Sequence, residues 1–213
     1  MTGALHLDWI DYAERLIGGG AIDWASPSAV AGLINKAQAL LPSDLVILPV
    51  ARMLRAIRSP ATEAASPKGA QPLRALLADA AVRAKLLETV AMMMVPALAL
   101  GLPTPGLLAA QAAEKIGALS PDMDEDLVDD AALYVADFLR IFANARIEGV
   151  VLTGTDSFPS LSAPIQKVAQ SYGWKFSDDG LWDGVRTVRI AVDAEPEAVL
   201  AQVRALRSQG ETV

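Results

Sequence analysis

The residues best placed to do chemistry follow a short apolar run at residues 149–152. This run has the composition of a buried strand, and Thr153, Thr155, Asp156 and Ser157 come directly after it. Ligands of parallel α/β sheets bind at the carboxyl ends of the strands. We therefore expect a small-molecule pocket here, with Asp156 as the general base or ligand anchor and the three hydroxyl groups orienting a substrate.

Asp156 and Ser157 also have a simpler interpretation. Aspartate and serine commonly cap turns and the first turns of helices, and a helix is expected from about Ser162 to Tyr172. The two interpretations differ in where the Asp156 side chain points. In the pocket interpretation its carboxylate faces a cleft and is partly desolvated, which suits binding or proton transfer.

A second set of candidate ligand-binding residues lies between Ala51 and Arg58, a segment expected to be helical. Arg52, Arg55 and Arg58 are three residues apart and share one helix face. A guanidinium group pairs with a carboxylate through two parallel hydrogen bonds. We therefore expect Arg52 or Arg55 to bind a substrate carboxylate.

The metal-ligating and nucleophilic side chains of the chain are few. There is no cysteine, which excludes disulfides, thiolate–zinc sites, iron–sulfur clusters and cysteine nucleophiles, and the single histidine excludes a multi-histidine metal site. We interpret His6 as a partly exposed residue at the start of a strand or helix, because no nucleophile motif accompanies it. The acidic residues between 122 and 130 lack the glycine turn of a calcium loop and fit a solvated helix start. We expect no metal and no cofactor.

The charge of the chain bears on its partners. The formal net charge is −7, and residues 107–213 carry 17 acidic against 9 basic side chains. An acidic surface repels phosphate backbones, so nucleic acid is not an expected partner. The most apolar stretch, which begins at Val90, is interrupted by Pro96 and is too short to span a bilayer, and no basic-then-apolar leader precedes it. We expect a cytoplasmic protein without a membrane partner.

The elements that must position these residues alternate between strands and helices from Val90 onward, which predicts a parallel sheet with helical cover. Turn signals at Asp179-Gly180 and Asp183-Gly184 predict a β-hairpin region near the end of the chain. The expected helices cover about 5–17, 26–41, 51–58, 73–88, 105–116, 122–147, 162–172 and 195–208, and the expected strands 45–48, 90–95, 149–152 and short stretches of 174–192. The run 45–48 is short enough to fit a helix as well.

The organisation along the chain predicts a single domain over residues 1–213, since no repeat and no long linker divides it. Residues 59–72 contain three prolines and several small polar side chains, so we expect a mobile loop there. The long helix should bury one stripe of side chains. That stripe comprises Leu127, Ala131, Tyr134, Val135, Phe138, Leu139 and Phe142.

Residues 90–172 resemble part of the barrel family of uroporphyrinogen decarboxylase and the related cobalamin-type methyltransferases. A strand with a Pro/Gly-rich end (94–106) leads into a helix, a long helix with an acidic start follows, and the next strand ends in Thr155-Asp156-Ser157-Phe158. The resemblance implies a reduced or partial (β/α) barrel with an aspartate–serine pair near the substrate. It implies fold ancestry more than activity, since the chain is shorter than the family barrel, has no recognisable arginine motif around 49–58 and has no zinc thiolates.

The sequence is compatible with two functions. The first is a small-molecule-binding protein or enzyme that uses the pocket after residues 149–152. The alternative is a non-catalytic interaction or subunit protein, such as a homodimer or a partner subunit, because a reduced barrel would leave apolar edges that need cover. The four tryptophans (Trp9, Trp24, Trp174 and Trp182) would suit such a surface, although each also fits a core.

Overall fold

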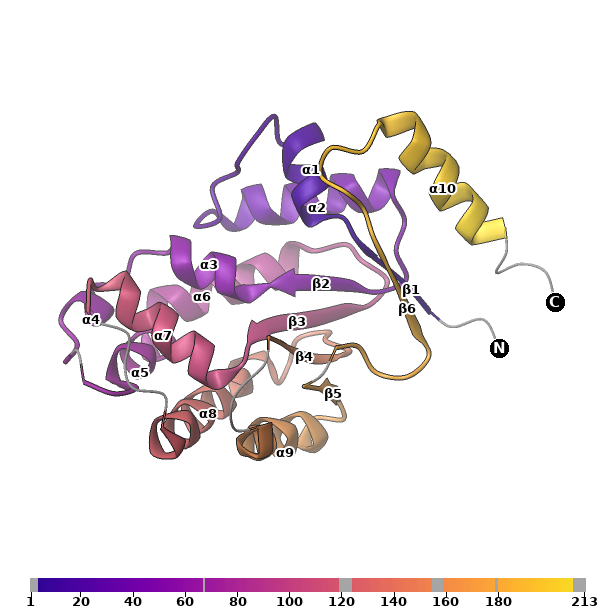
Figure 1. Cartoon of the computed structure of the whole chain (residues 1–213). Coiled ribbons are helices and arrows are strands. Elements are labelled where there is room, and N and C mark those ends of the chain that lie inside the picture. Colours follow the sequence, from indigo (N-terminus) through magenta and orange to yellow (C-terminus); the bar gives the residue numbers. More distant parts are fainter. Residues whose placement is uncertain (1–3, 67, 119–123, 155–158, 179, 209–213) are drawn as a thin grey trace.

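The protein is built from parallel strands and the helices between them (Figure 1). The computed structural model describes residues 4–66, 68–118, 124–154, 159–178 and 180–208. The strands are β1 (Ala4–Asp8), β2 (Val46–Pro49), β3 (Leu98–Pro103), β4 (Gly149–Thr153), β5 (Lys175–Ser177) and β6 (Val185–Arg189). The helices are α1 (Ile10–Leu16), α2 (Pro27–Leu40), α3 (Val50–Ala56), α4 (Pro60–Glu63), α5 (Gln71–Ala78), α6 (Ala80–Met92), α7 (Pro105–Lys115), α8 (Glu125–Leu139), α9 (Ala163–Ser171) and α10 (Pro196–Ser208), with 3-10 turns at Arg140–Phe142 and Pro159–Ser162.

The strand order is that of an incomplete barrel. One sheet has the order β2-β3-β4-β5, the other pairs β1 with β6, and every described strand pair is parallel. A parallel bridge between His6 and Leu45 joins the two sheets, so the strands follow one another as 6-1-2-3-4-5. The predicted partial barrel-like α/β fold with helical cover is therefore confirmed.

The predicted hairpin near the end of the chain is wrong. Short strands do form there, but β5 pairs with β4 and β6 pairs with β1. The chain between them packs Leu181 and Trp182 against the inner face of the sheet, which carries Leu45, Ala99 and Val151. The gain from burying these side chains favours a crossover to the far edge over a tight turn back onto β5.

The two faces of the sheet are packed differently. The outer face contributes alternate residues of β3 and β4, such as Leu100 and Val150, to the main core beneath the helices. The inner face carries Leu45, Ile47, Ala99 and Val151, and the ring of Trp182 lies over Gly149: a Cβ atom there would come within 2.8 Å of the indole. The inner face of the sheet is thus covered by the chain itself.

Helix α8 buries the predicted stripe. Phe138 and Phe142 are fully buried, with ring centroids 5.7 Å apart in an edge-to-face arrangement. Tyr134 is the exception, because it is only half-buried and lies under the guanidinium of Arg74. The helix is shorter than predicted: Asp124 caps it by accepting from the backbone N–H of Leu127 at 2.8 Å, and a 3-10 turn follows Leu139.

A membrane-spanning helix needs a long apolar run, and none of the helices in the described part of the chain has one.

Two segments have a different structure from the one predicted. Residues 5–17 form β1 and α1 rather than one helix, because residues 4–8 alternate between the outer core and the inner face. The second segment is the predicted strand 90–95, whose first residues form the end of α6 instead. The strand itself, β3, begins after Pro96. All six residues of β3 are buried, so its apolar run carries no alternation to distinguish it from a buried helix.

The region before β3 contains more helix than predicted. The expected helix 73–88 is divided at Asp79, whose carboxylate caps α6 by accepting from Ala81 N–H at 2.7 Å and Val82 N–H at 3.2 Å. The expected loop 59–72 contains α4, and Ser59 and Thr62 are buried. Mobility of this segment stays a prediction.

Candidate functional site

A cavity of about 420 Å³ lies at the carboxyl ends of β1 and β6. It is bounded by the end of β1, the start of α1 and the segment that leaves β6. In parallel barrels this edge of the sheet carries the ligand sites. Its lining comprises Asp8, Asp11, Arg189, Ile190, Ala191, Val192 and Asp193, which we call the strand-end pocket.

The alternation of β1 explains why charged groups meet here. Leu5 and Leu7 belong to the outer core, so His6 and Asp8 project from the inner face. The register pairs Asp8 with Arg189, and Arg189 Nε lies 3.9 Å from Asp8 Oδ2. The two side chains are 50% and 79% exposed, and ion pairs this exposed contribute little to stability. Both groups can therefore exchange this contact for a ligand.

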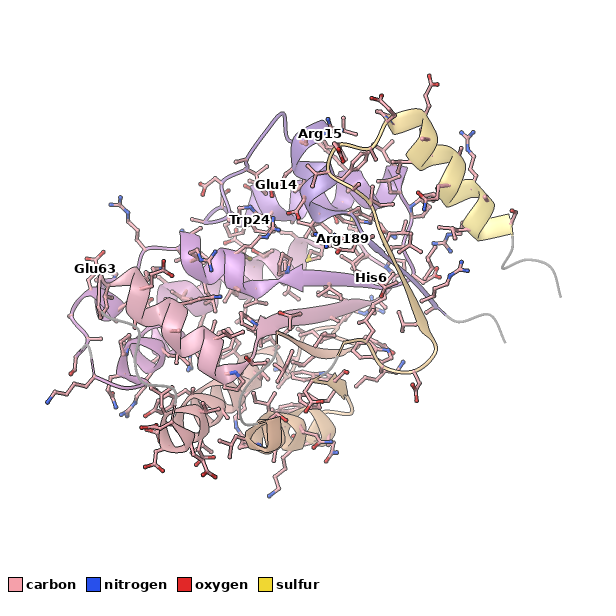
Figure 2. All side chains as sticks on the ribbon, viewed as in Figure 1. His6, Glu14, Arg15, Trp24, Glu63 and Arg189 are labelled. Carbon is pink, nitrogen blue, oxygen red and sulfur yellow. The ribbon has the colours of Figure 1, made fainter. Side chains whose placement is uncertain are left out.

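A second charged cluster adjoins the strand-end pocket through Asp11. Arg52, at the start of α3, donates to Glu14 Oε2 at 2.8 Å and to Asp11 Oδ1, and its guanidinium lies 5.3 Å from the ring centroid of Trp24. The Trp24 indole N–H donates to Glu14 Oε1 at 2.8 Å. Figure 2 shows Glu14 and Trp24 close together above α3. This arrangement fixes Arg52 and compensates the charge of Asp11.

The predicted arginines differ in what they contact. Arg52 is bound by two carboxylates of its own chain rather than left free for a substrate. Arg55 is exposed and makes no side-chain hydrogen bond or ion pair with any described residue. Substrate binding by either arginine stays a prediction.

The remaining predicted residues lie at the end of β4. Thr153 is exposed, and its hydroxyl donates to the carbonyl oxygen of Leu102 at 3.2 Å. Thr155, Asp156 and Ser157 lie outside the described residues, so the position of the Asp156 carboxylate stays a prediction. Thr153 lies at the same edge of the sheet as Asp8 and Arg189, but on a different strand.

His6 is not the partly exposed residue expected from the sequence. It lies inside β1, is 7% exposed, and its Nδ1 is 3.0 Å from the carbonyl oxygen of Leu45. Burial lowers the pKa of His6, while the Leu45 carbonyl and the Asp8 carboxylate act in the opposite direction. The neutral imidazole is therefore the favoured form at neutral pH.

The lowered pKa of His6 predicts an acid-sensitive stability. The unfolded chain binds a proton near pH 6.5, whereas the folded chain binds it only at lower pH. The stability that the neutral His6 contributes is complete above the pKa that His6 has in the unfolded chain. It is lost as the pH falls from there through the lower pKa that His6 has in the folded chain. Urea unfolding at pH 8 and pH 5 should show that His6→Gln loses less stability between the two pH values than the parent chain. An equal loss in both would mean that His6 titrates normally.

The Arg52 cluster predicts a small, specific loss of stability. Arg52→Met should lower the free energy of unfolding by about 1 kcal/mol, because it leaves Glu14, whose side chain is only 15% exposed, without its cation. Arg55→Met is the matched control one turn along the same helix, and it should have no measurable effect. Equal losses of unfolding free energy in the two variants, measured by chemical denaturation, would show that the Arg52 cluster does not stabilise the protein.

The acidic residues of the strand-end pocket were not singled out by sequence reasoning. Three aspartates line it against one arginine, so its walls favour a positively charged group. Asp8 would have been found from the alternation of residues 4–8, which places it at the end of a strand. Within the described part of the chain, no three His, Cys, Asp or Glu side chains are arranged to hold a metal ion.

Comparison with known proteins found no relative of this chain. No family model matches the sequence, and no curated protein or solved structure matches it significantly.

Proposed function

We propose that the protein binds a small polar molecule with a positively charged nitrogen in the strand-end pocket. The observation that carries this proposal is the placement of Asp8, Asp11 and Asp193 around a cavity at the carboxyl ends of two neighbouring parallel strands. Asp11 is compensated by Arg52, so Asp8 and Asp193 are the carboxylates available to a cation.

The rest of the lining narrows the class of ligand. Arg189 can receive a carboxylate of the ligand, because its only described ion pair is the loose contact with Asp8. Ile190, Ala191 and Val192 are the apolar residues of the lining. A short aliphatic chain with an ammonium group and a carboxylate fits this combination best. A volume of about 420 Å³ suits a molecule of that size.

Three ligands of equal chain length test the proposal. Calorimetric titration should rank 4-aminobutyrate first, butylamine second and butyrate last. Asp8→Asn should weaken the two amines, whereas Arg189→Gln should weaken 4-aminobutyrate and leave butylamine unchanged. Asp129→Asn, an exposed change on α8, is the control and should alter none of them. Binding of butyrate as tightly as the amines, or of none of the three, would contradict the proposal.

The predicted pocket after residues 149–152 belongs to the same functional hypothesis. Thr153 lies at the carboxyl edge that carries the strand-end pocket, and in this proposal Asp156 serves a ligand bound at that edge. The kinship with the uroporphyrinogen decarboxylase-type barrel stays a proposal, which rests on the sequence pattern of residues 90–172. Loss of binding in Asp156→Asn would extend the site to β4.

The alternative function is that of a non-catalytic interaction or subunit protein. It rests on the sheet edges that a reduced barrel leaves unpaired. Leu181 and Trp182 cover the inner face of the sheet, and β5 and β6 are the edge strands of the described part of the chain. Trp9 and Trp174 are buried, and Trp24 and Trp182 are half-buried. A homodimer or partner subunit stays a prediction, which light scattering in solution tests directly.

A further inference from the structure

A second cavity, of about 980 Å³, lies at the opposite end of the sheet, where β3 begins. It is formed by the end of α6, the segment leading into β3 and the turn after the 3-10 helix at 140–142. Its lining comprises Gln38, Leu87, Val90, Ala91, Met93, Met94, Val95, Pro96, Leu98, Ile141, Asn144, Ala145 and Arg146, which we call the amino-end groove.

The walls of the amino-end groove are mostly apolar and include two methionines. Ten of the thirteen lining residues are apolar, and the Met94 side chain is 76% exposed. The backbone beneath it is fixed, because Asn35 Nδ2 donates to Met92 O at 3.0 Å and Met94 N–H donates to Asn35 Oδ1 at 2.8 Å. A fixed backbone with flexible thioether side chains provides a preformed surface that adapts to an apolar ligand.

The polar groups of the groove are few and differ in their availability. Gln38 is already used, since its amide exchanges two hydrogen bonds with the backbone of Ser43 at 2.7 and 3.2 Å. Asn144 and Arg146 make no side-chain bond with any residue the structure describes, and Arg146 is the only charged residue in the lining. The groove therefore offers one uncompensated cation beside an apolar surface.

We propose that the amino-end groove binds an amphipathic anion, with an alkyl chain against Met93, Val95 and Leu98 and a carboxylate on Arg146. An apolar body provides the area that the lining can bury. A carboxylate forms charge-assisted hydrogen bonds with a guanidinium, and Asn144 adds an amide donor beside it. The chain is acidic overall, so a lone arginine here selects for an anion locally rather than through net charge.

The experiment compares octanoate with 1-octanol, which share the alkyl chain and differ in the head group. Each displaces 1-anilinonaphthalene-8-sulfonate, whose fluorescence reports occupancy of the groove. Octanoate should displace the probe at a concentration about tenfold lower than 1-octanol, as a charge-assisted hydrogen bond predicts. Arg146→Gln should remove this preference and leave 1-octanol unchanged. Arg204→Gln, an exposed change on α10, should leave both unchanged.

A further variant tests the location. Ala91→Trp places a large side chain in the groove from the exposed face of α6 and should abolish displacement by both ligands while the circular dichroism spectrum stays native. Equal displacement by the two ligands in the parent chain, a preference that survives Arg146→Gln, or undiminished binding in Ala91→Trp would overturn the proposal. The strand-end pocket is untouched by these variants, so titration of 4-aminobutyrate into them keeps the two proposals separate.

Discussion

Replacing Phe138 by Ala should lower the free energy of unfolding by about 3–5 kcal/mol. Phe138 is fully buried in α8 and packs edge-to-face against Phe142, which is itself fully buried. Truncation removes the transfer free energy of the ring and leaves a cavity that a tightly packed core closes only in part. Urea denaturation monitored by circular dichroism measures the loss.

Leu133→Ala provides the control on the same helix. Leu133 is 49% exposed, so its truncation should cost less than about 1 kcal/mol. A loss below 1 kcal/mol for Phe138→Ala would mean that the face of α8 that carries Phe138 does not pack in the core.

Gly149→Ala should destabilise the protein by about 1–3 kcal/mol and shift the tryptophan fluorescence. A Cβ atom at Gly149 would come within 2.8 Å of the Trp182 indole and would also crowd the carbonyl oxygen of Lys175, which is backbone and cannot yield easily. The substitution should therefore displace Trp182 from the inner face of the sheet.

Gly32→Ala is the matched control. Gly32 lies within α2, and a Cβ atom there meets nothing within 4 Å. Alanine has the higher helix propensity, so this variant should be more stable by about 0.5–1 kcal/mol. Gly149→Ala with unchanged stability and fluorescence would mean that Trp182 does not cover the inner face.

The elements that the sequence predicted well are those with both a boundary signal and a period. Ser26-Pro27 marks the start of α2, and Thr104-Pro105 marks the start of α7. The strand at residues 149–152 was predicted from composition, since a short apolar run fits a buried strand. The start of β3 lacked such a signal: the methionine run before it continues a helix, and only the packing of both faces identifies the strand.

Sequence reasoning selected residues at the end of β4, whereas the strand-end pocket lies at the ends of β1 and β6. The rule that ligands bind at the carboxyl ends of parallel strands selects the edge of the sheet at which the strand-end pocket lies. The sequence could not show that β6 returns to pair with β1, because this pairing joins residues almost the whole chain apart. Without that pairing, Arg189 and Asp193 have no visible relation to Asp8 and Asp11.

A crystal structure of the protein with 4-aminobutyrate tests the central claim most directly, which is that the strand-end pocket binds a small aminated molecule. We expect the ammonium group within hydrogen-bond distance of the Asp8 or Asp193 carboxylate, and the ligand carboxylate on Arg189 in place of the loose contact with Asp8. Ligand bound at another place on the chain, or a strand-end pocket that holds only water at saturating ligand, would contradict the claim.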